Sequence, residues 1–189
     1  MFSRGFWVIV KREIKRFLFL YKQTLIPSVI SSSLYIIVFG AAMGSRIGDI
    51  KGVAYINFIV PGLVMMAVIN SAYQNSSSSI MQAKFLRFIE DILITPISGF
   101  EISLSYIIGG MVRGILNGIL VLILGYFLTG FHMDNWFLTF VYLFTVSWAF
   151  AGAGVIVGIF AKTWDSIMVI TNFFFMPLIF LGGVFYSID

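Results

Sequence analysis

The sequence has no cysteine and few charged residues. Without cysteine, the chain cannot carry a disulfide framework, a thiol nucleophile or a thiolate-bound metal. Charged residues make up 11% of the 189 residues and hydrophobic residues 60%, whereas soluble domains carry about 25% charged residues. A soluble fold of this size still exposes a large share of its surface, so it could not hide this much apolar area from water. The composition excludes a soluble enzyme and a disordered chain and indicates a protein that lies in lipid.

The composition also argues against a nucleic-acid partner. The formal net charge is +4, but basic residues of a membrane protein gather in its cytoplasmic loops. The positive charge therefore predicts an orientation in the membrane, and we expect no nucleic-acid binding.

The uncharged stretches between the charge clusters have the length of membrane spans. A helix needs about 20 residues to cross the bilayer, and continuous apolar runs of that length favour helices over the alternating pattern of an outer-membrane barrel. The predicted fold is therefore all-α, a polytopic helical bundle forming a single membrane domain over residues 1–189. The five predicted spans are residues 25–45, 57–80, 103–128, 136–160 and 166–186.

The distribution of Lys and Arg predicts the orientation of these spans. With the N-terminus inside, the outer loops hold two basic residues, Arg46 and Lys51. The inner segments then hold nine, namely Arg4, Lys11, Arg12, Lys15, Arg16, Lys22, Lys84, Arg87 and Lys162. Because basic residues mark cytoplasmic loops, we expect a multi-pass protein of the cell (inner or plasma) membrane whose N-terminus is cytoplasmic.

Residues 2–22 have the pattern of a basic amphipathic helix. An apolar stripe recurs at three- and four-residue spacing, at Trp7, Val10, Ile14, Phe17 and Tyr21. The candidate membrane-anchoring residues are on the other side: Lys11, Arg12, Lys15 and Arg16. Such a helix can lie in the membrane interface, held by apolar burial and by anionic lipid, or it can serve as a positively charged topology anchor. The two interpretations are compatible.

The longest soluble segment is the predicted cytoplasmic loop at residues 82–98. Its apolar residues have helical spacing, and Pro96 is expected to end the helix near Ile94, because the residue before proline is pushed out of the α region. We expect one short amphipathic helix from about Lys84 to Ile94, which either docks into a groove on a partner protein or rests on lipid. The candidate coupling residues are Phe85, Arg87, Phe88, Ile89, Glu90, Asp91, Ile92 and Pro96.

Small and polar residues recur inside the predicted spans. Glycine pairs at four-residue spacing let helix backbones approach closely in lipid; they are Gly40 and Gly44, Gly110, Gly114 and Gly118, and Gly154 and Gly158. The candidates for lining a polar path are Asn70, Gln74 and Asn117, and they can equally bond to a neighbouring helix. Arg113 is the one basic residue well inside an apolar stretch, so it is either functional or reaches the inner headgroups by snorkelling.

Catalysis has little support in the sequence. His132 stands beside Asp134 without further metal-ligand residues, and no span holds an acidic pair that could relay protons. Lys162-Thr163 has the ending of a phosphate-binding loop, but Ile156 and Ala161 occupy the positions where that motif needs glycine. We expect no metal, no cofactor and no ATP binding by this chain, so energy for any work must come from elsewhere.

The layout resembles the membrane permeases of ABC-2 type ATP-binding-cassette exporters, and the resemblance covers the whole chain. It rests on four features in order: the basic amphipathic N-terminal helix, YINFIVPGL at 55–63, RFIEDILITPIS at 87–98 followed by Glu101, and GGVFYSID at 182–189. It is nearest to exporters of polysaccharides, lipo-oligosaccharides or drugs. The resemblance implies a homodimer or heterodimer of permeases over two ATPase subunits, with the cytoplasmic helix coupling ATPase closure to helix motion.

The sequence departs from the family pattern in one respect. The family has a sixth span after an outer re-entrant segment, and this chain stops before it, so we expect the sequence to be truncated or only part of the protein. The leading hypothesis is a permease subunit that exports an amphipathic, glycan, lipid or drug-like substrate with a separate ATPase. The alternatives are a membrane scaffold or assembly subunit without a transport path and an intramembrane enzyme, which lacks a catalytic constellation.

Overall fold

The computed structural model describes residues 3–47, 49–50, 52–133 and 135–186, without the side chains of residues 41–47. The predictions that concern Arg46, Lys51, Asp134, the surroundings of Gly44 and residues 187–189 lie outside the described residues.

Most described residues are helical. The helices are α1 (Arg4–Phe19), α2 (Tyr21–Thr24), α3 (Ile26–Ile47), α4 (Tyr55–Phe85), α5 (Ile89–Leu93), α6 (Gly99–Thr129), α7 (Trp136–Phe160), α8 (Trp164–Ile170), a π-helix (Thr171–Phe175) and α9 (Met176–Leu181). Five described stretches are long and apolar enough to cross a membrane: Tyr21–Gly40, Tyr55–Phe85, Gly99–Thr129, Trp136–Phe160 and Trp164–Leu181. The predicted all-α polytopic bundle is therefore confirmed.

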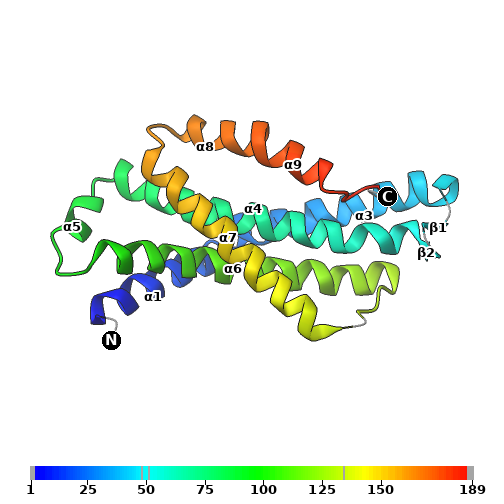
Figure 1. Cartoon of the computed structure of the whole chain (residues 1–189), viewed down its shortest axis with the longest axis horizontal. Coiled ribbons are helices and arrows are strands. Elements are labelled where there is room, and N and C mark those ends of the chain that lie inside the picture. Colours follow the sequence, from blue (N-terminus) through cyan, green and yellow to red (C-terminus); the bar gives the residue numbers. More distant parts are fainter. Residues whose placement is uncertain (1–2, 48, 51, 134, 187–189) are drawn as a thin grey trace.

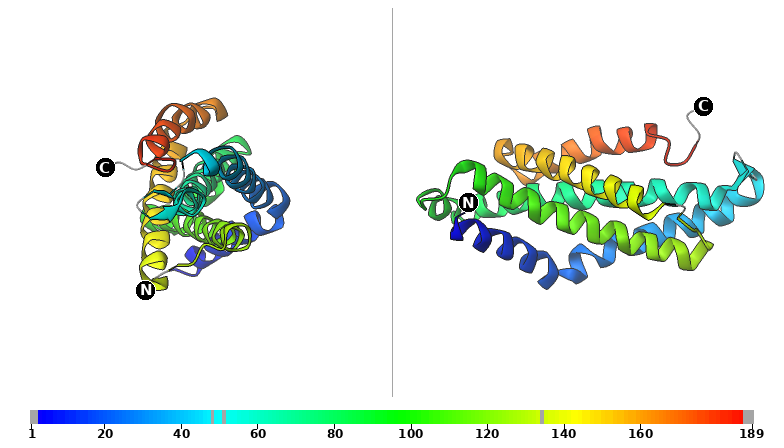
Figure 2. Two further views of the ribbon diagram at one scale, coloured as in Figure 1. Left: turned by 90° about the vertical axis from the view of Figure 1, so that its right-hand side faces the viewer. Right: turned by 60° about the horizontal axis from the view of Figure 1, so that its bottom comes forward.

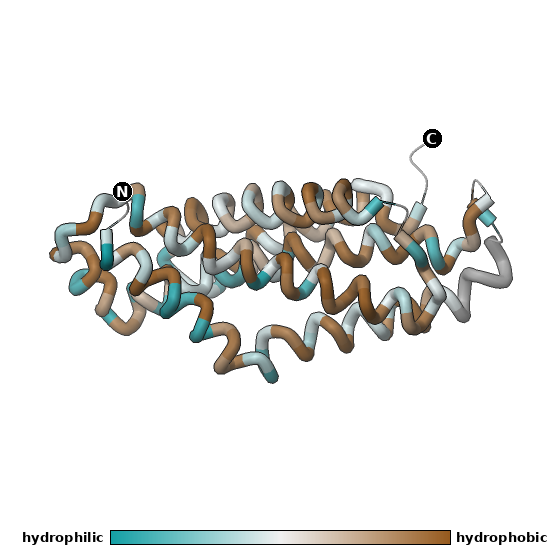
Figure 3. Tube along the Cα trace, turned by 90° about the horizontal axis from the view of Figure 1, so that it is seen from below, coloured by the Kyte–Doolittle hydropathy of each residue, from teal (hydrophilic) through white to brown (hydrophobic). Residues whose placement is uncertain are grey.

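The helices form an elongated bundle with two distinct ends (Figures 1 and 2). The start of α1 and α5 lie at one end, and the β-hairpin, the α6–α7 connection and the C-terminal end lie at the other. Hydrophobic residues run along most of the long helices (Figure 3). The structure thus groups the start of α1 with α5, and the β-hairpin with the end of α6, as the charge distribution predicts.

Helix α4 is the centre of the bundle, and small residues let its neighbours approach it. Its buried side chains occur along its whole length. An added Cβ on Gly114 of α6 would lie 3.0 Å from the Cβ of Ala72, and one on Gly158 of α7 would lie 3.1 Å from the carbonyl oxygen of Ser77. The glycine ladders on α6 and α7 therefore serve close helix packing against α4, as their spacing predicts.

Gly154 offers a test of this packing. An added Cβ would lie 2.5 Å from the carbonyl oxygen of Tyr73 and 3.1 Å from the Cβ of Ser76, whereas none of the described atoms lies within 4 Å of a Cβ added to Gly152. Gly154→Ala is expected to destabilise the bundle by about 1–3 kcal/mol, the usual cost of overpacking. A lower thermal midpoint in detergent for Gly154→Ala, but not for Gly152→Ala, would confirm this; equal midpoints would contradict it.

The fifth span differs from its prediction. It was predicted as one helix over 166–186, but it consists of α8, a π-helical turn and α9, and it ends at Leu181. Pro177 is the second residue of α9, two positions after the end of the π-helix, and has no amide hydrogen to donate to a regular α-helical ladder. Gly182 and Gly183 then end the helix, and Gly183 has a positive φ of 80°.

Two of the sequence motifs that carry the family resemblance pack on each other. The hydroxyl of Tyr55 donates to the carbonyl oxygen of Phe185 at 3.2 Å. A Cβ added to Gly62 would lie 2.9 Å from the Cα of Val184, so glycine is needed where the two backbones meet. Helix α4 continues through Pro61 and Gly62 as a single helix.

A short hairpin joins α3 to α4 at the end of the bundle opposite α5. Strand β1 (Asp49–Ile50) pairs antiparallel with β2 (Val53–Ala54). Gly52 has a φ of 81°, which suits the turn. An outer loop was predicted for this region.

Candidate functional site

The buried face of α1 matches the predicted apolar stripe only in part, since Val10 and Phe17 belong to both. Its buried residues are Phe6, Ile9, Val10, Glu13 and Phe17. Trp7 and Tyr21, which belong to the predicted apolar stripe, are 54% and 47% exposed. The helix was predicted to lie in the membrane interface or to serve as a positively charged topology anchor; in the structure its buried face packs against α6 and contacts α4.

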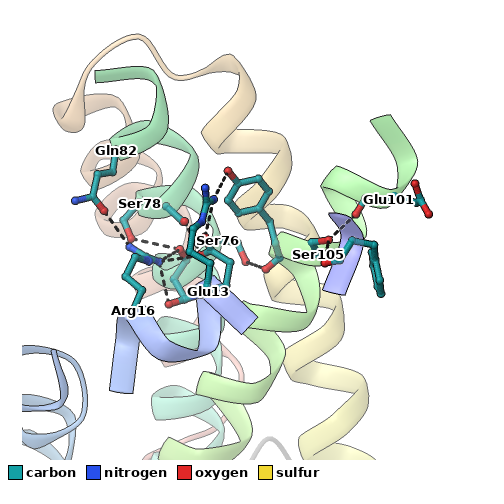
Figure 4. Close-up of polar contacts among 12 residues, drawn as sticks. Glu13, Arg16, Ser76, Ser78, Gln82, Glu101 and Ser105 are labelled. Carbon is teal, nitrogen blue, oxygen red and sulfur yellow. Dashed lines mark hydrogen bonds and ion pairs between the residues drawn. The ribbon is translucent and has the colours of Figure 1, made fainter. Parts of the chain in front are cut away.

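Glu13 is the centre of a buried polar network between α1 and α4 (Figure 4). It is fully buried, and its Oε2 accepts a hydrogen bond from Ser79 at 2.5 Å and lies 3.3 Å from Nη2 of Arg16. Its Oε1 accepts from Arg12 at 3.0 Å. Burying a carboxylate is costly unless it is paired and hydrogen-bonded, and both oxygens of Glu13 meet that condition.

The four predicted membrane-anchoring residues divide into two pairs. Lys11 and Lys15 are exposed. Arg12 instead donates to the Tyr106 hydroxyl at 3.0 Å, and Arg16 donates to the backbone and side-chain oxygens of Asn75 at 3.1 and 3.2 Å. The prediction that all four residues face lipid headgroups therefore needs correction for Arg12 and Arg16, because polar groups of α1, α4 and α6 engage them.

Sequence reasoning missed Glu13, although a signal was available. Phe6, Ile9, Glu13 and Phe17 follow one another at three- or four-residue spacing, so they share a face of the helix. A lone acid on that face, three residues before Arg16, indicates a buried ion pair.

A second polar contact fixes the beginning of α1. Ser98 and Glu101 form a capping box at the start of α6. The same Glu101 accepts hydrogen bonds from the backbone nitrogen of Ser3 at 2.7 Å and from its hydroxyl at 3.2 Å. Ser3 in turn caps α1 by accepting from the backbone of Phe6. One carboxylate thus joins the N-termini of two helices.

The predicted coupling segment is broken into two pieces. A single helix from Lys84 to Ile94 was expected, but α4 continues to Phe85 and the five-residue α5 begins at Ile89. Arg87 lies between them with a φ of 59°, a left-handed conformation that no regular α-helix accommodates. Helix α5 ends at Leu93, before Pro96, as the proline predicted.

Only part of the predicted apolar docking face is accessible. Ile92 is buried, Ile89 packs against the cluster of Ile80 and Tyr106, and the guanidinium of Arg12 lies 5.1 Å from the ring centroid of Phe88. The other predicted residues are exposed: Phe85, Arg87, Glu90, Asp91 and Pro96. Further exposed apolar side chains, not predicted, are Leu86, Leu93 and Ile94, with Ile94 83% exposed. The exposed apolar surface is therefore shifted toward both ends of the segment.

The predicted path-lining residues lie in different surroundings. Asn70 and Gln74 line a cavity of about 270 Å³ between α2–α3, α4 and α6, and Gln74 also lines an adjoining cavity of about 430 Å³ that extends to α8. Asn117 lines neither of these cavities. It is fully buried between α6 and α4, where it donates to the hydroxyl of Ser71, so its prediction as a path-lining residue is wrong for this arrangement.

Arg113 lines both of these cavities. Arg113 is 8% exposed, and its Nη2 donates to the carbonyl oxygen of Thr24 at 3.3 Å. Snorkelling, one of the two predicted interpretations, does not describe a side chain that is buried among α2, α4 and α6. Because hydroxyl, amide and guanidinium groups contribute to the lining of both cavities, the space can receive a polar ligand.

Known proteins with similar sequences indicate the family to which these features belong. The family model described as "ABC-2 type transporter" matches residues 4–189. The inner membrane transport permease YadH of Escherichia coli strain K12 is 44% identical over 187 residues, which cover 97% of this chain and 73% of that relative. The YadH permeases of Escherichia coli O157:H7 and Shigella flexneri match with the same identity and the same coverage. No solved structure matches the chain.

Proposed function

Because this chain belongs to the ABC-2 type transporter family and is a membrane transport permease, we propose that it forms the membrane part of an ATP-driven exporter. A separate ATPase subunit binds the segment 85–96 and supplies the energy. A second permease copy completes the path, and the substrate is amphipathic, a glycan, a lipid or a drug-like molecule.

The observation that carries this proposal is the exposed apolar surface at one end of the bundle. Phe85, Leu86, Leu93 and Ile94 are between 57% and 83% exposed. Helices α4 and α6 have 31 residues each and are therefore about 46 Å long, whereas the hydrocarbon core is about 30 Å thick. The end that carries α5 can therefore project from the hydrocarbon, where a soluble partner can reach its apolar side chains.

The remaining residues of this segment can transmit a force to the spans. Phe88 lies against Arg12, which is bonded to Glu13 of α1, and Ile92 and Ile89 pack into the bundle. A displacement of the segment would thus act on α1, α4 and α6 together. This supports a coupling role over a helix that merely rests on lipid.

The polar cavities beside α4 favour transport over the scaffold alternative. A scaffold subunit has no use for a cavity lined by Gln74, Asn75 and Arg113 at the depth of the spans, where uncompensated polar groups are costly.

The proposal is tested by reconstitution. A full-length permease is purified with the candidate ATPase, inserted into liposomes and supplied with ATP on the ATPase side. We expect stable association and ATP-dependent movement of an amphipathic substrate. A permease that binds the ATPase but supports no movement with any of the substrate classes named above would favour the scaffold.

The orientation is proposed separately: α5 and the N-terminus lie in the cytoplasm. Since the chain has no native cysteine, single cysteines report on accessibility. Asp91→Cys and His132→Cys replace exposed residues at opposite ends of the bundle. An impermeant thiol reagent is expected to label His132→Cys in cells with a permeable outer envelope, and Asp91→Cys only after lysis. The reverse pattern would invert the proposed orientation.

A further inference from the structure

The two polar cavities are lined by a positive charge that has no role in the proposed coupling to the ATPase. They share four lining residues, Gln23, Thr24, Gln74 and Arg113. The larger one is also lined by Arg16, Asn75 and Asn172. Among the described residues, no aspartate or glutamate lines either cavity. The polar part of the lining therefore consists of cations and neutral hydrogen-bonding groups, and the rest of the lining is apolar.

The two arginines differ in how their charge is compensated. Arg16 is paired with the carboxylate of Glu13. Arg113 has a hydrogen bond to the neutral carbonyl of Thr24, and no described carboxylate lies within ion-pair distance of it. Its Nε is buried and has no hydrogen-bond partner among the described residues. A residue that is 8% exposed thus carries a charge without a counter-charge.

A buried arginine without a counter-charge destabilises the folded protein unless a ligand pairs with it. A buried charge without a partner is strongly destabilising, and ionisable residues inside membrane spans mark functional sites. The planar guanidinium favours carboxylate and phosphate, which it can bind through two parallel hydrogen bonds. The amide and hydroxyl groups of the lining can donate further hydrogen bonds to the same oxygens.

We infer that the space formed by these two adjoining cavities binds the anionic group of an amphipathic molecule, a phosphate or a carboxylate. Arg113, which lines both cavities, supplies the principal positive charge. The apolar part of the ligand has a surface at the margin of the larger cavity, where Trp164 and Met168 are 44% and 64% exposed. The inference deepens the proposed function and rests on it, because it assigns a charge to the transported class. Binding, however, can be measured without transport.

The test uses the full-length permease in dodecyl maltoside, with radiolabelled n-dodecyl phosphate as the probe. Hydrogen bonds to charged groups correspond to about 10- to 100-fold in affinity, so Arg113→Gln is expected to weaken binding by that factor. Gln74→Glu places a negative charge on the lining and should weaken it similarly. Arg4→Gln, which removes an exposed arginine at the start of α1, is the matched control and should leave binding unchanged.

Stability without ligand separates this role from a structural one. An arginine that holds the fold together lowers the thermal midpoint when it is replaced. Arg113→Gln is expected to leave the midpoint unchanged or to raise it, because it removes a buried charge without a partner. If Arg113→Gln does not fold, Arg113 is structural and the inference fails, unless Gln74→Glu folds and loses dodecyl phosphate binding.

Competition identifies the source of the anion. Displacement of the probe by phosphatidylglycerol, but not by phosphatidylcholine, assigns the site to a lipid headgroup; displacement by inorganic phosphate assigns it to free phosphate. Equal affinity of the wild type, Arg113→Gln and Gln74→Glu would overturn the inference, even if ATP-driven export is intact. Conversely, Arg113-dependent binding in a permease that does not export with its ATPase would leave the site standing and overturn the proposed function.

Discussion

Replacement of Phe85 and Ile94 by alanine is expected to release the ATPase from the permease. These side chains are 73% and 83% exposed at the end of the bundle that carries α5. Apolar anchors dominate protein interfaces and often contribute about 2 kcal/mol or more each, which corresponds to a factor of about 30 in affinity. Association is measured by copurification and by titration of the ATPase onto the full-length permease.

A matched control lies at the other end of the bundle. Phe127 is 78% exposed and Ile123 is 48% exposed, both on α6, so their double replacement removes the same side-chain types without touching the proposed interface. Glu90→Ala should be mild, because exposed rim charges add little. Phe88→Ala with Ile89→Ala should instead lower stability or uncouple hydrolysis, since both residues pack within this chain. Normal association of the Phe85/Ile94 variant would make the segment a lipid-resting element.

The second large effect is expected at Glu13. Glu13→Ala leaves Arg12, Arg16 and Ser79 without their shared acceptor. Removing one partner of a buried ion pair costs about 3–5 kcal/mol, so the thermal midpoint of the purified permease should fall and α1 should become accessible to protease. Glu90→Ala is the matched control, because Glu90 is an exposed acid near the same end.

A double-mutant cycle distinguishes the network from a general loss of packing. If Glu13 acts through Arg16, the double variant Glu13→Ala/Arg16→Ala should be less destabilised than the sum of the single variants, with a coupling of about 0.5–3 kcal/mol. Additive losses would mean that the two side chains stabilise α1 independently, against the geometry of the network.

The sequence by itself determined the spans, the helix-packing glycines and the family. Residues 136–160 were predicted and observed with the same bounds, because about 20 apolar residues suffice to cross a bilayer and charges end the run. The ladder of Gly110, Gly114 and Gly118 was equally readable, since close backbone approach in lipid requires small residues at this spacing.

Only the tertiary structure decided which polar groups meet and which helix faces are buried. Lipid and protein interior are both apolar, so hydrophobicity does not tell a lipid-facing side from a protein-facing one. For that reason the buried face of α1, centred on Glu13, was predicted only in part, and Asn117 was assigned to a path although it bonds to Ser71. The turn at Arg87 depends on a backbone conformation that no local sequence pattern specifies. The surroundings of Arg113 depend on a contact with Thr24, which is distant in the sequence. The contact of Arg113 with Thr24 forms only when α2 and α6 pack together.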